Sequence, residues 1–160
     1  MGWDDFKGII HWEKGVARKL TPEEQAEFIE RGFDLAKQWG AYVWGIGRRQ
    51  AREDYREWEP FSTIEPVSGR FMGILPGHGL EFDETLRWND DIDFCLQSLN
   101  KHRIVLRFNA YQAEGDGERP RRPLKEDRAE FKKLQEKWGS EIVYQTKEGA
   151  QVVRVPMEGV

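Results

Sequence analysis

Acidic side chains gather in the segment from Glu81 to Asp93, which contains a single basic residue, Arg87. Such a cluster of carboxylates can steer a positively charged partner and raise its association rate. The same segment contains Trp88, a residue type that is enriched at the energetic centres of protein interfaces. We therefore predict a partner-binding surface formed by Glu81, Asp83, Glu84, Trp88, Asp90 and Asp91.

Two other interpretations of these acids are open. Asp90 can cap the helix that follows it, with Asp93 as the acid of a capping box, and the other carboxylates would then lie in a solvated loop. Carboxylate oxygens can also hold a hard cation, but the spacing lacks the alternating acids, the glycine and the distal glutamate of a calcium loop. We therefore predict no metal site in this segment.

A histidine, His78, lies between two glycines in the sequence Pro76-Gly-His-Gly79. Glycines let the backbone approach another molecule closely, and a histidine in such a loop can act as a general base or as a ligand. The nearest carboxylates in the sequence that could assist the imidazole belong to Glu81 and Asp83. An exposed turn histidine explains the pattern more simply, so the His78 loop is the alternative site.

No complete set of catalytic residues is evident. The chain has no Gly-x-Ser-x-Gly elbow, and its single cysteine, Cys95, falls on the apolar face of a predicted helix. Cysteines and histidines at zinc-ligand spacing are absent. The run Gly45-Ile-Gly47-Arg48-Arg49 resembles a phosphate-binding turn, but it lacks the third glycine of the dinucleotide fingerprint and the Lys-Ser/Thr of the Walker loop. We expect no cofactor and favour a non-enzymatic function.

The overall charge limits the class of partner. A net charge of −4 and a pI near 5.5 argue against nucleic-acid binding, which usually comes with a basic excess. Nucleic-acid binding would need a basic patch of Arg48, Arg49, Arg52 and Arg56, and acids lie among these arginines in the chain. The N-terminus has no signal-peptide pattern, and no run of apolar residues is long enough to span a membrane. With one cysteine besides, we expect a cytoplasmic protein that does not cross a membrane.

The clearest structural pattern runs from Trp88 to Gln112. Apolar residues recur there at helical spacing, at Ile92, Cys95, Leu96 and Leu99. From Ile104 onward, side chains alternate in the period-two pattern of a half-buried strand. A helix that leads directly into a strand predicts an α+β domain whose central strand covers residues 103–111.

Other elements are predicted from their boundary signals. In Thr21-Pro-Glu-Glu24, Thr21 caps a helix, Pro22 takes its first position and Glu24 completes a capping box, and Gly40 ends the helix. Further helices are predicted over 3–17, 48–58 and 124–138. Strands are predicted at 71–75 and Leu80–Phe82, and a hairpin over 142–155 with its turn at Lys147-Glu-Gly149. A strand or turn is favoured at 41–47, where a continuing helix also fits the pattern.

These elements predict a single α+β domain over residues 1–160, with about four helices on a small, mostly antiparallel sheet that the C-terminal hairpin joins. Of the seven tryptophans, spacing assigns Trp39, Trp58 and Trp138 to the core. The pattern buries the other four less easily: an exposed pair among them would be a binding surface, and the alternative for each is a partly buried ring at the edge of the core; they are Trp3, Trp12, Trp44 and Trp88. The predicted function is a protein-binding module of the inhibitor, immunity, antitoxin or adaptor type, which occludes a basic surface of another protein. The alternative is a small enzyme or ligand-binding domain that uses the His78 loop. The pattern leaves the oligomeric state open.

Overall fold

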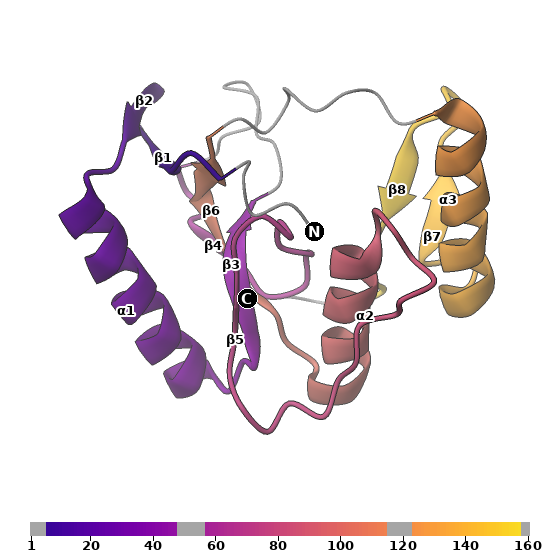
Figure 1. Ribbon diagram of the computed structural model, residues 1–160, viewed down its shortest axis with the longest axis horizontal. Coiled ribbons are helices and arrows are strands. Elements are labelled where there is room, and N and C mark those ends of the chain that lie inside the picture. The colour runs from indigo at the N-terminus through magenta and orange to yellow at the C-terminus, as the bar shows by residue number, and fades with distance from the viewer. Residues whose placement is uncertain (1–5, 48–56, 115–122, 158–160) are drawn as a thin grey trace.

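The computed structural model describes residues 6–47, 57–114 and 123–157, and within them the chain has the predicted α+β fold (Figure 1). The described helices are α1 (Pro22–Trp39), α2 (Asp90–His102) and α3 (Leu124–Trp138). The described residues thus contain three helices, where about four were predicted. From residue 6 onward, the segment predicted as a helix over 3–17 contributes strands instead. The helix predicted over 48–58 falls almost entirely outside the described residues.

In the part of the chain that the structure describes, the main sheet has six strands in the order β2-β1-β6-β3-β5, and β4 also pairs with β6. Their bounds are β1 Ile9–Glu13, β2 Val16–Lys19, β3 Val43–Gly47, β4 Phe61–Ser62, β5 Met72–Ile74 and β6 Leu106–Ala113. Only the pairing of β3 with β6 is parallel within this sheet, and the other pairings are antiparallel. Because β6 pairs with three strands, the prediction of a central strand over 103–111 is confirmed.

The sheet lies between α1 on one side and α2 on the other, and α3 packs beyond α2 together with a C-terminal hairpin (Figure 1). An aromatic cluster fills the space between α1 and the sheet, where Phe28 contacts Trp44 and Phe108 edge to face. A second cluster joins the sheet, α2 and α3, and it includes Val43, Phe94 and Leu134.

Helix α1 begins and ends as the sequence predicts. The Thr21 side chain accepts from the Glu24 N–H, and the Glu24 carboxylate accepts from the Thr21 N–H, so the capping box is complete. Gly40 ends the helix in the left-handed conformation, with φ at 72°. Residues close in the sequence therefore determine where this helix begins and ends. Its buried residues Phe28, Gly32 and Ala36 face the sheet.

Trp138 packs against the core as predicted, but three other tryptophans differ from the prediction. Trp44 is only 1% exposed, because β3 is an inner strand that is buried along its whole length. Its indole lies so close to Gly32 that a Cβ there would stand 2.2 Å from the ring. Trp39 and Trp58, assigned to the core by spacing, are 39% and 80% exposed. Trp39 is the last residue of α1, and its ring reaches Phe61 rather than the inner core.

Within the described part of the segment predicted as a helix over 3–17, which begins at residue 6, the chain forms the hairpin of β1 and β2 instead. Lys14 and Gly15 have φ values of 51° and 76°, and two successive positive φ values are the geometry of a type I′ turn. Strand β1 then pairs with the end of β6, Ile9 opposite Ala113. Of the apolar residues that suggested a helix, Ile9, Ile10 and Trp12 lie in β1 and Val16 begins β2.

The predicted C-terminal hairpin forms, as β7 (Val143–Gln145) and β8 (Gln151–Val153), with Gly149 in its turn at a φ of 87°. It does not join the main sheet as predicted but makes a separate two-stranded sheet against α3. The outer edge of β7 explains this, because the Val143 N–H donates to the Gly139 carbonyl and the Val143 carbonyl accepts from Gln135. Helix α3 and its C-terminal turn therefore take the hydrogen bonds that a further strand would need.

Candidate functional site

The acidic segment does not cap α2 in the predicted way. The N-cap is Asn89 rather than Asp90, and its side chain makes no capping hydrogen bond. Asp91, in the first turn, is buried, and its carboxylate accepts from the N–H of Gly69 at 2.9 Å and of Ile92 at 2.8 Å. Asp91 thus ties the loop at Gly69 to the start of the helix, and this leaves it little surface for a partner.

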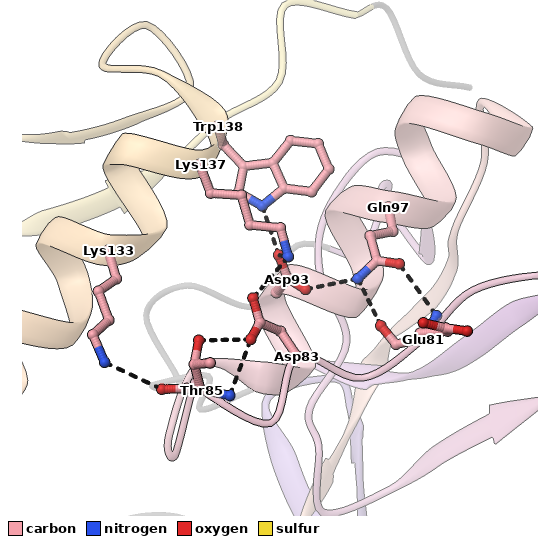
Figure 2. Close-up of polar contacts among 8 residues, drawn as sticks. All are labelled: Glu81, Asp83, Thr85, Asp93, Gln97, Lys133, Lys137 and Trp138. Atoms are coloured by element: carbon pink, nitrogen blue, oxygen red, sulfur yellow. Dashed lines mark hydrogen bonds and ion pairs between the residues drawn. The ribbon is translucent and has the colours of Figure 1, made fainter.

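The carboxylate of Asp93 is fully buried at the junction of α2 and α3 (Figure 2). It accepts from the indole Nε1 of Trp138 at 2.8 Å and from the Gln97 amide at 2.7 Å. It is also 2.9 Å from the ammonium of Lys137. The residue expected to serve as a capping-box acid is therefore the centre of a polar contact between two helices.

Asp83 belongs to the same network. Its carboxylate accepts from the backbone N–H and the hydroxyl of Thr85, at 3.0 and 2.6 Å, and pairs with Lys137 at 2.9 Å. These bonds, from Thr85 first and Lys137 next, lower the pKa of Asp83 to about 2. Burial alone would lower the pKa of Lys137, but its bonds to Asp93 and Asp83 outweigh that effect and raise it. One cation of α3 therefore neutralises two of the acids.

Two further side chains of α3 hold the main chain of the acidic segment. The buried carboxylate of Glu130 accepts from the backbone N–H of Trp88 at 2.6 Å and of Asn89 at 2.7 Å. Lys133 donates to the carbonyl of Thr85 at 3.4 Å (Figure 2). A large part of the segment is thus a docking surface for α3 of the same chain.

What remains at the surface is a short stretch at the start of the segment. Glu81 and Glu84 are exposed, and between them Phe82 is 43% exposed while its ring stacks on buried Phe94, with centroids 4.2 Å apart. The main chain at Glu81 is fixed, because its N–H donates to the Gln97 amide oxygen and its carbonyl accepts from the Gln97 amide nitrogen. These bonds to a side chain replace the strand pairing predicted for Leu80–Phe82, which the structure does not form. We call Glu81, Phe82 and Glu84 the acidic–aromatic patch.

The other predicted partner-binding residues are less accessible. Trp88 is half-buried, and the guanidinium of Arg87 lies 5.1 Å from the centre of its ring. Asp90 is half-buried too, and desolvation, assisted by the charge of Asp91, raises its pKa. Partner contact through these side chains would therefore require more rearrangement than contact through the acidic–aromatic patch.

The His78 loop is closed on itself. The imidazole Nδ1 accepts from the N–H of Leu80 at 2.9 Å, and the His78 carbonyl accepts from Nε2 of His102 at 2.7 Å. The ring is half-buried and packs edge to face on Phe94. Of the two carboxylates predicted to assist the imidazole, that of Asp83 is bound by Thr85 and Lys137 instead. The arrangement resembles a turn stabilised by its own histidine more than a general base.

The structure describes the weaker candidate sites only in part. Gly45 packs tightly in β3, where a Cβ would stand 2.6 Å from the carbonyl oxygen of Phe71, so close packing explains this glycine. The four arginines proposed for nucleic-acid binding lie outside the described residues. Within residues 6–47, 57–114 and 123–157, no cluster of three or more His, Cys, Asp or Glu side chains could hold a metal ion.

A polar cluster on β6 was not anticipated. Arg107 forms an ion pair with Glu65 and donates to Asn109 at 2.8 Å, and Asn109 in turn donates to the Glu59 carbonyl at 2.9 Å. Burial lowers the pKa of Arg107, and the charge of Glu65 opposes the shift. The only signal in the sequence is that two polar residues share one face of a strand. The cluster fastens the segment around 59–66 to the sheet.

None of the described helices is both long and apolar enough to cross a lipid bilayer. Comparison of the chain with protein-family models, with curated proteins and with solved structures gave no match. The case for a function therefore depends on the geometry of the site.

Proposed function

We propose that this chain is a non-enzymatic protein-binding module, of the inhibitor, immunity, antitoxin or adaptor type, that covers a basic surface of a partner protein. The observation that carries the proposal is the acidic–aromatic patch, in which Phe82, a residue that is 43% exposed, lies in the sequence between the exposed acids Glu81 and Glu84. An aromatic side chain can serve as the buried anchor of an interface, and carboxylates at its rim can steer a basic partner toward it.

The patch is held in place before any partner arrives. The ring of Phe82 stacks on Phe94 with an angle of 11° between the planes, and both main-chain groups of Glu81 are hydrogen-bonded by Gln97. A preorganised anchor loses little conformational entropy on binding. Glu81 and Glu84 would speed the encounter with a basic surface, and Phe82 would fill an apolar pocket within it.

The alternative, a small enzyme or ligand-binding domain that uses the His78 loop, has less support. A neutral imidazole has one nitrogen that can accept a proton and so act as a base. In His78 this nitrogen is Nδ1, which already accepts a backbone hydrogen bond. We also propose that the chain works without a cofactor and in the cytoplasm, since a chain with a single cysteine cannot form an internal disulfide.

The proposal is tested with three variants of the tagged chain and a partner identified by stoichiometric capture from its native cells. Purified partner and chain are then measured by surface plasmon resonance at low and high salt. Glu81→Lys with Glu84→Lys should slow association about tenfold or more at low salt, and Phe82→Ala should speed dissociation. The matched control is Glu126→Lys with Glu141→Lys, which makes the same charge change at exposed positions elsewhere.

The control variant should bind as the wild type does, apart from a small and uniform effect of net charge. If the patch and control variants lose affinity equally, or if neither does, the patch is not the interface. If the only partners are nucleic acids, the protein-binding function itself is wrong.

A further inference from the structure

A second candidate interaction surface is formed by the C-terminal part of the chain, where the tip of the β7–β8 hairpin faces the first half of α3 (Figure 1). A groove of about 630 Å³ runs between them. It is lined from the helix by Leu124, Asp127, Arg128, Phe131, Lys132 and Gln135, and from the hairpin by Gln145, Gly149 and Gln151. Its size is within the range of about 300–1,000 Å³ that is usual for ligand sites.

The groove has an apolar part and a basic part. Phe131 is 7% exposed, whereas Leu124, at the start of the helix, is 63% exposed. Arg128 and Lys132 are exposed and lie one turn apart on α3, so that both charges are on the same side of the helix. An amphipathic and positively charged surface of this kind matches a ligand that combines carboxylates with an apolar side chain.

The acid among the lining residues is already engaged. Asp127 accepts from the Gln151 amide at 3.0 Å, and this bond also joins the helix to the hairpin. Gln135 uses its amide in the same way, donating to the Val143 carbonyl at 2.9 Å. Gln145 is opposite Gln151 in the hairpin, and an amide side chain at that position can bond the main chain of a bound segment. Asp127 keeps its charge in this bond, but the two cations of Arg128 and Lys132 outnumber it, so the net charge of the groove lining is positive.

We propose that this groove binds an extended acidic segment of a partner protein, with an apolar side chain over Phe131 and carboxylates on Arg128 and Lys132. An extended segment suits the site better than an enclosed small molecule, because most of the lining residues are exposed and would cover only one side of it. The surface is separate from the acidic–aromatic patch and opposite to it in charge. A chain with both surfaces would bridge a basic and an acidic partner.

The test uses the full-length, ¹⁵N-labelled chain and the probe peptide acetyl-Glu-Glu-Phe-Glu-Glu-amide, followed by NMR chemical shifts at low salt. Saturable shifts are expected at Leu124, Phe131, Gln145 and Gln151. Acetyl-Lys-Lys-Phe-Lys-Lys-amide should leave those signals unmoved. A third probe, 4-phenylbutyrate, distinguishes a site for small anions from one for a peptide.

Charge reversal assigns the binding to the groove. Arg128→Glu with Lys132→Glu should raise the dissociation constant of the acidic peptide about tenfold or more. Lys125→Glu with Lys147→Glu makes the same charge change at exposed positions that do not line the groove, and it should change the constant less than threefold. The unbound spectrum of each variant shows whether it is folded.

Four results would overturn the proposal. They are the absence of saturable shifts with the acidic peptide at millimolar concentration, shifts confined to other elements, equal losses in the two charge-reversed variants, and tighter binding of 4-phenylbutyrate than of the peptide.

Discussion

Lys137 of α3 lies 2.9 Å from a carboxylate oxygen of Asp93, a residue of α2 whose side chain is completely buried. The same ammonium lies 2.9 Å from Asp83, so a single cation joins the acidic segment to the C-terminal helix. Trp138, the next residue, also donates to Asp93. The acids whose sequence pattern predicted an interface with a partner therefore form, for the most part, an intramolecular interface with α3.

Replacing Lys137 with methionine should destabilise the fold. The methionine keeps most of the packing volume but leaves a buried carboxylate without its cation, and breaking such a pair costs about 3–5 kcal/mol when both partners are fully buried. Because the Lys137 side chain is 38% exposed, we expect a smaller loss of about 1–3 kcal/mol. Urea denaturation measures the loss.

The matched control for that variant is Lys132→Met. Lys132 is 75% exposed, and its ammonium is 3.9 Å from Glu136, so its replacement should change the free energy of unfolding by less than about 0.5 kcal/mol. Equal effects of the two substitutions would mean that the pair with Asp93 contributes nothing beyond a surface contact.

The pH dependence of stability should reflect Asp83. Its pKa falls from an ordinary 3.8 to about 2 in the folded chain. A carboxyl group with a lowered pKa in the folded state stabilises that state above the unfolded pKa, and the contribution is lost as the pH falls toward the folded pKa. Stability should therefore decline between pH 3.8 and about 2, and Asp83→Asn should make the decline shallower. Urea midpoints across this interval measure it, and parallel curves for the two proteins would contradict the assignment.

Local signals predicted the elements whose ends depend on neighbouring residues. Thr21 and Glu24 identify the start of α1, and Gly40 identifies its end, because capping bonds and a left-handed glycine involve only residues close in sequence. The spacing of apolar residues predicted α2 and β6 for the same reason. The hairpin of β1 and β2 was missed because Lys14, not the usual asparagine or glycine, takes the first positive φ of its turn.

Contacts between distant residues could not be predicted in this way. The acids of the segment 81–93 were identified, but Asp83 and Asp93 also bind Lys137 and Trp138 of α3, more than forty positions away. Trp44 shows the same limit, since its burial depends on glycines at positions 32 and 73 that leave room for its ring. The pattern of apolar residues within one element predicts which of its faces is buried. Which other element packs against that face depends on the whole fold.

The contact between Gly32 and Trp44 gives a third prediction. In an exposed helix, replacing glycine with alanine stabilises by about 0.5–1 kcal/mol. At Gly32 a Cβ would stand 2.2 Å from the Trp44 ring, which cannot move away because Gly73 lies equally close on its other edge. Gly32→Ala should therefore destabilise the fold by about 1–3 kcal/mol. A gain in thermal stability would mean that the ring has room to shift.

The last prediction concerns Glu130, the buried acid of α3 that accepts from the backbone N–H groups of Trp88 and Asn89. Alanine at this position would leave both donors without a partner in a buried environment, at a cost of about 1–3 kcal/mol. Glutamine keeps an oxygen that can accept, so Glu130→Gln should lose markedly less.

Amide hydrogen exchange distinguishes this role from simple packing. In Glu130→Ala, exchange at Trp88 and Asn89 should quicken more than exchange in α1, because only the docking of the acidic segment is weakened. In Glu130→Gln the two amides should stay protected. Uniform acceleration in both variants would instead mean that Glu130 supports the fold as a whole. In that case its two hydrogen bonds would not act as the local fastening of the segment to α3.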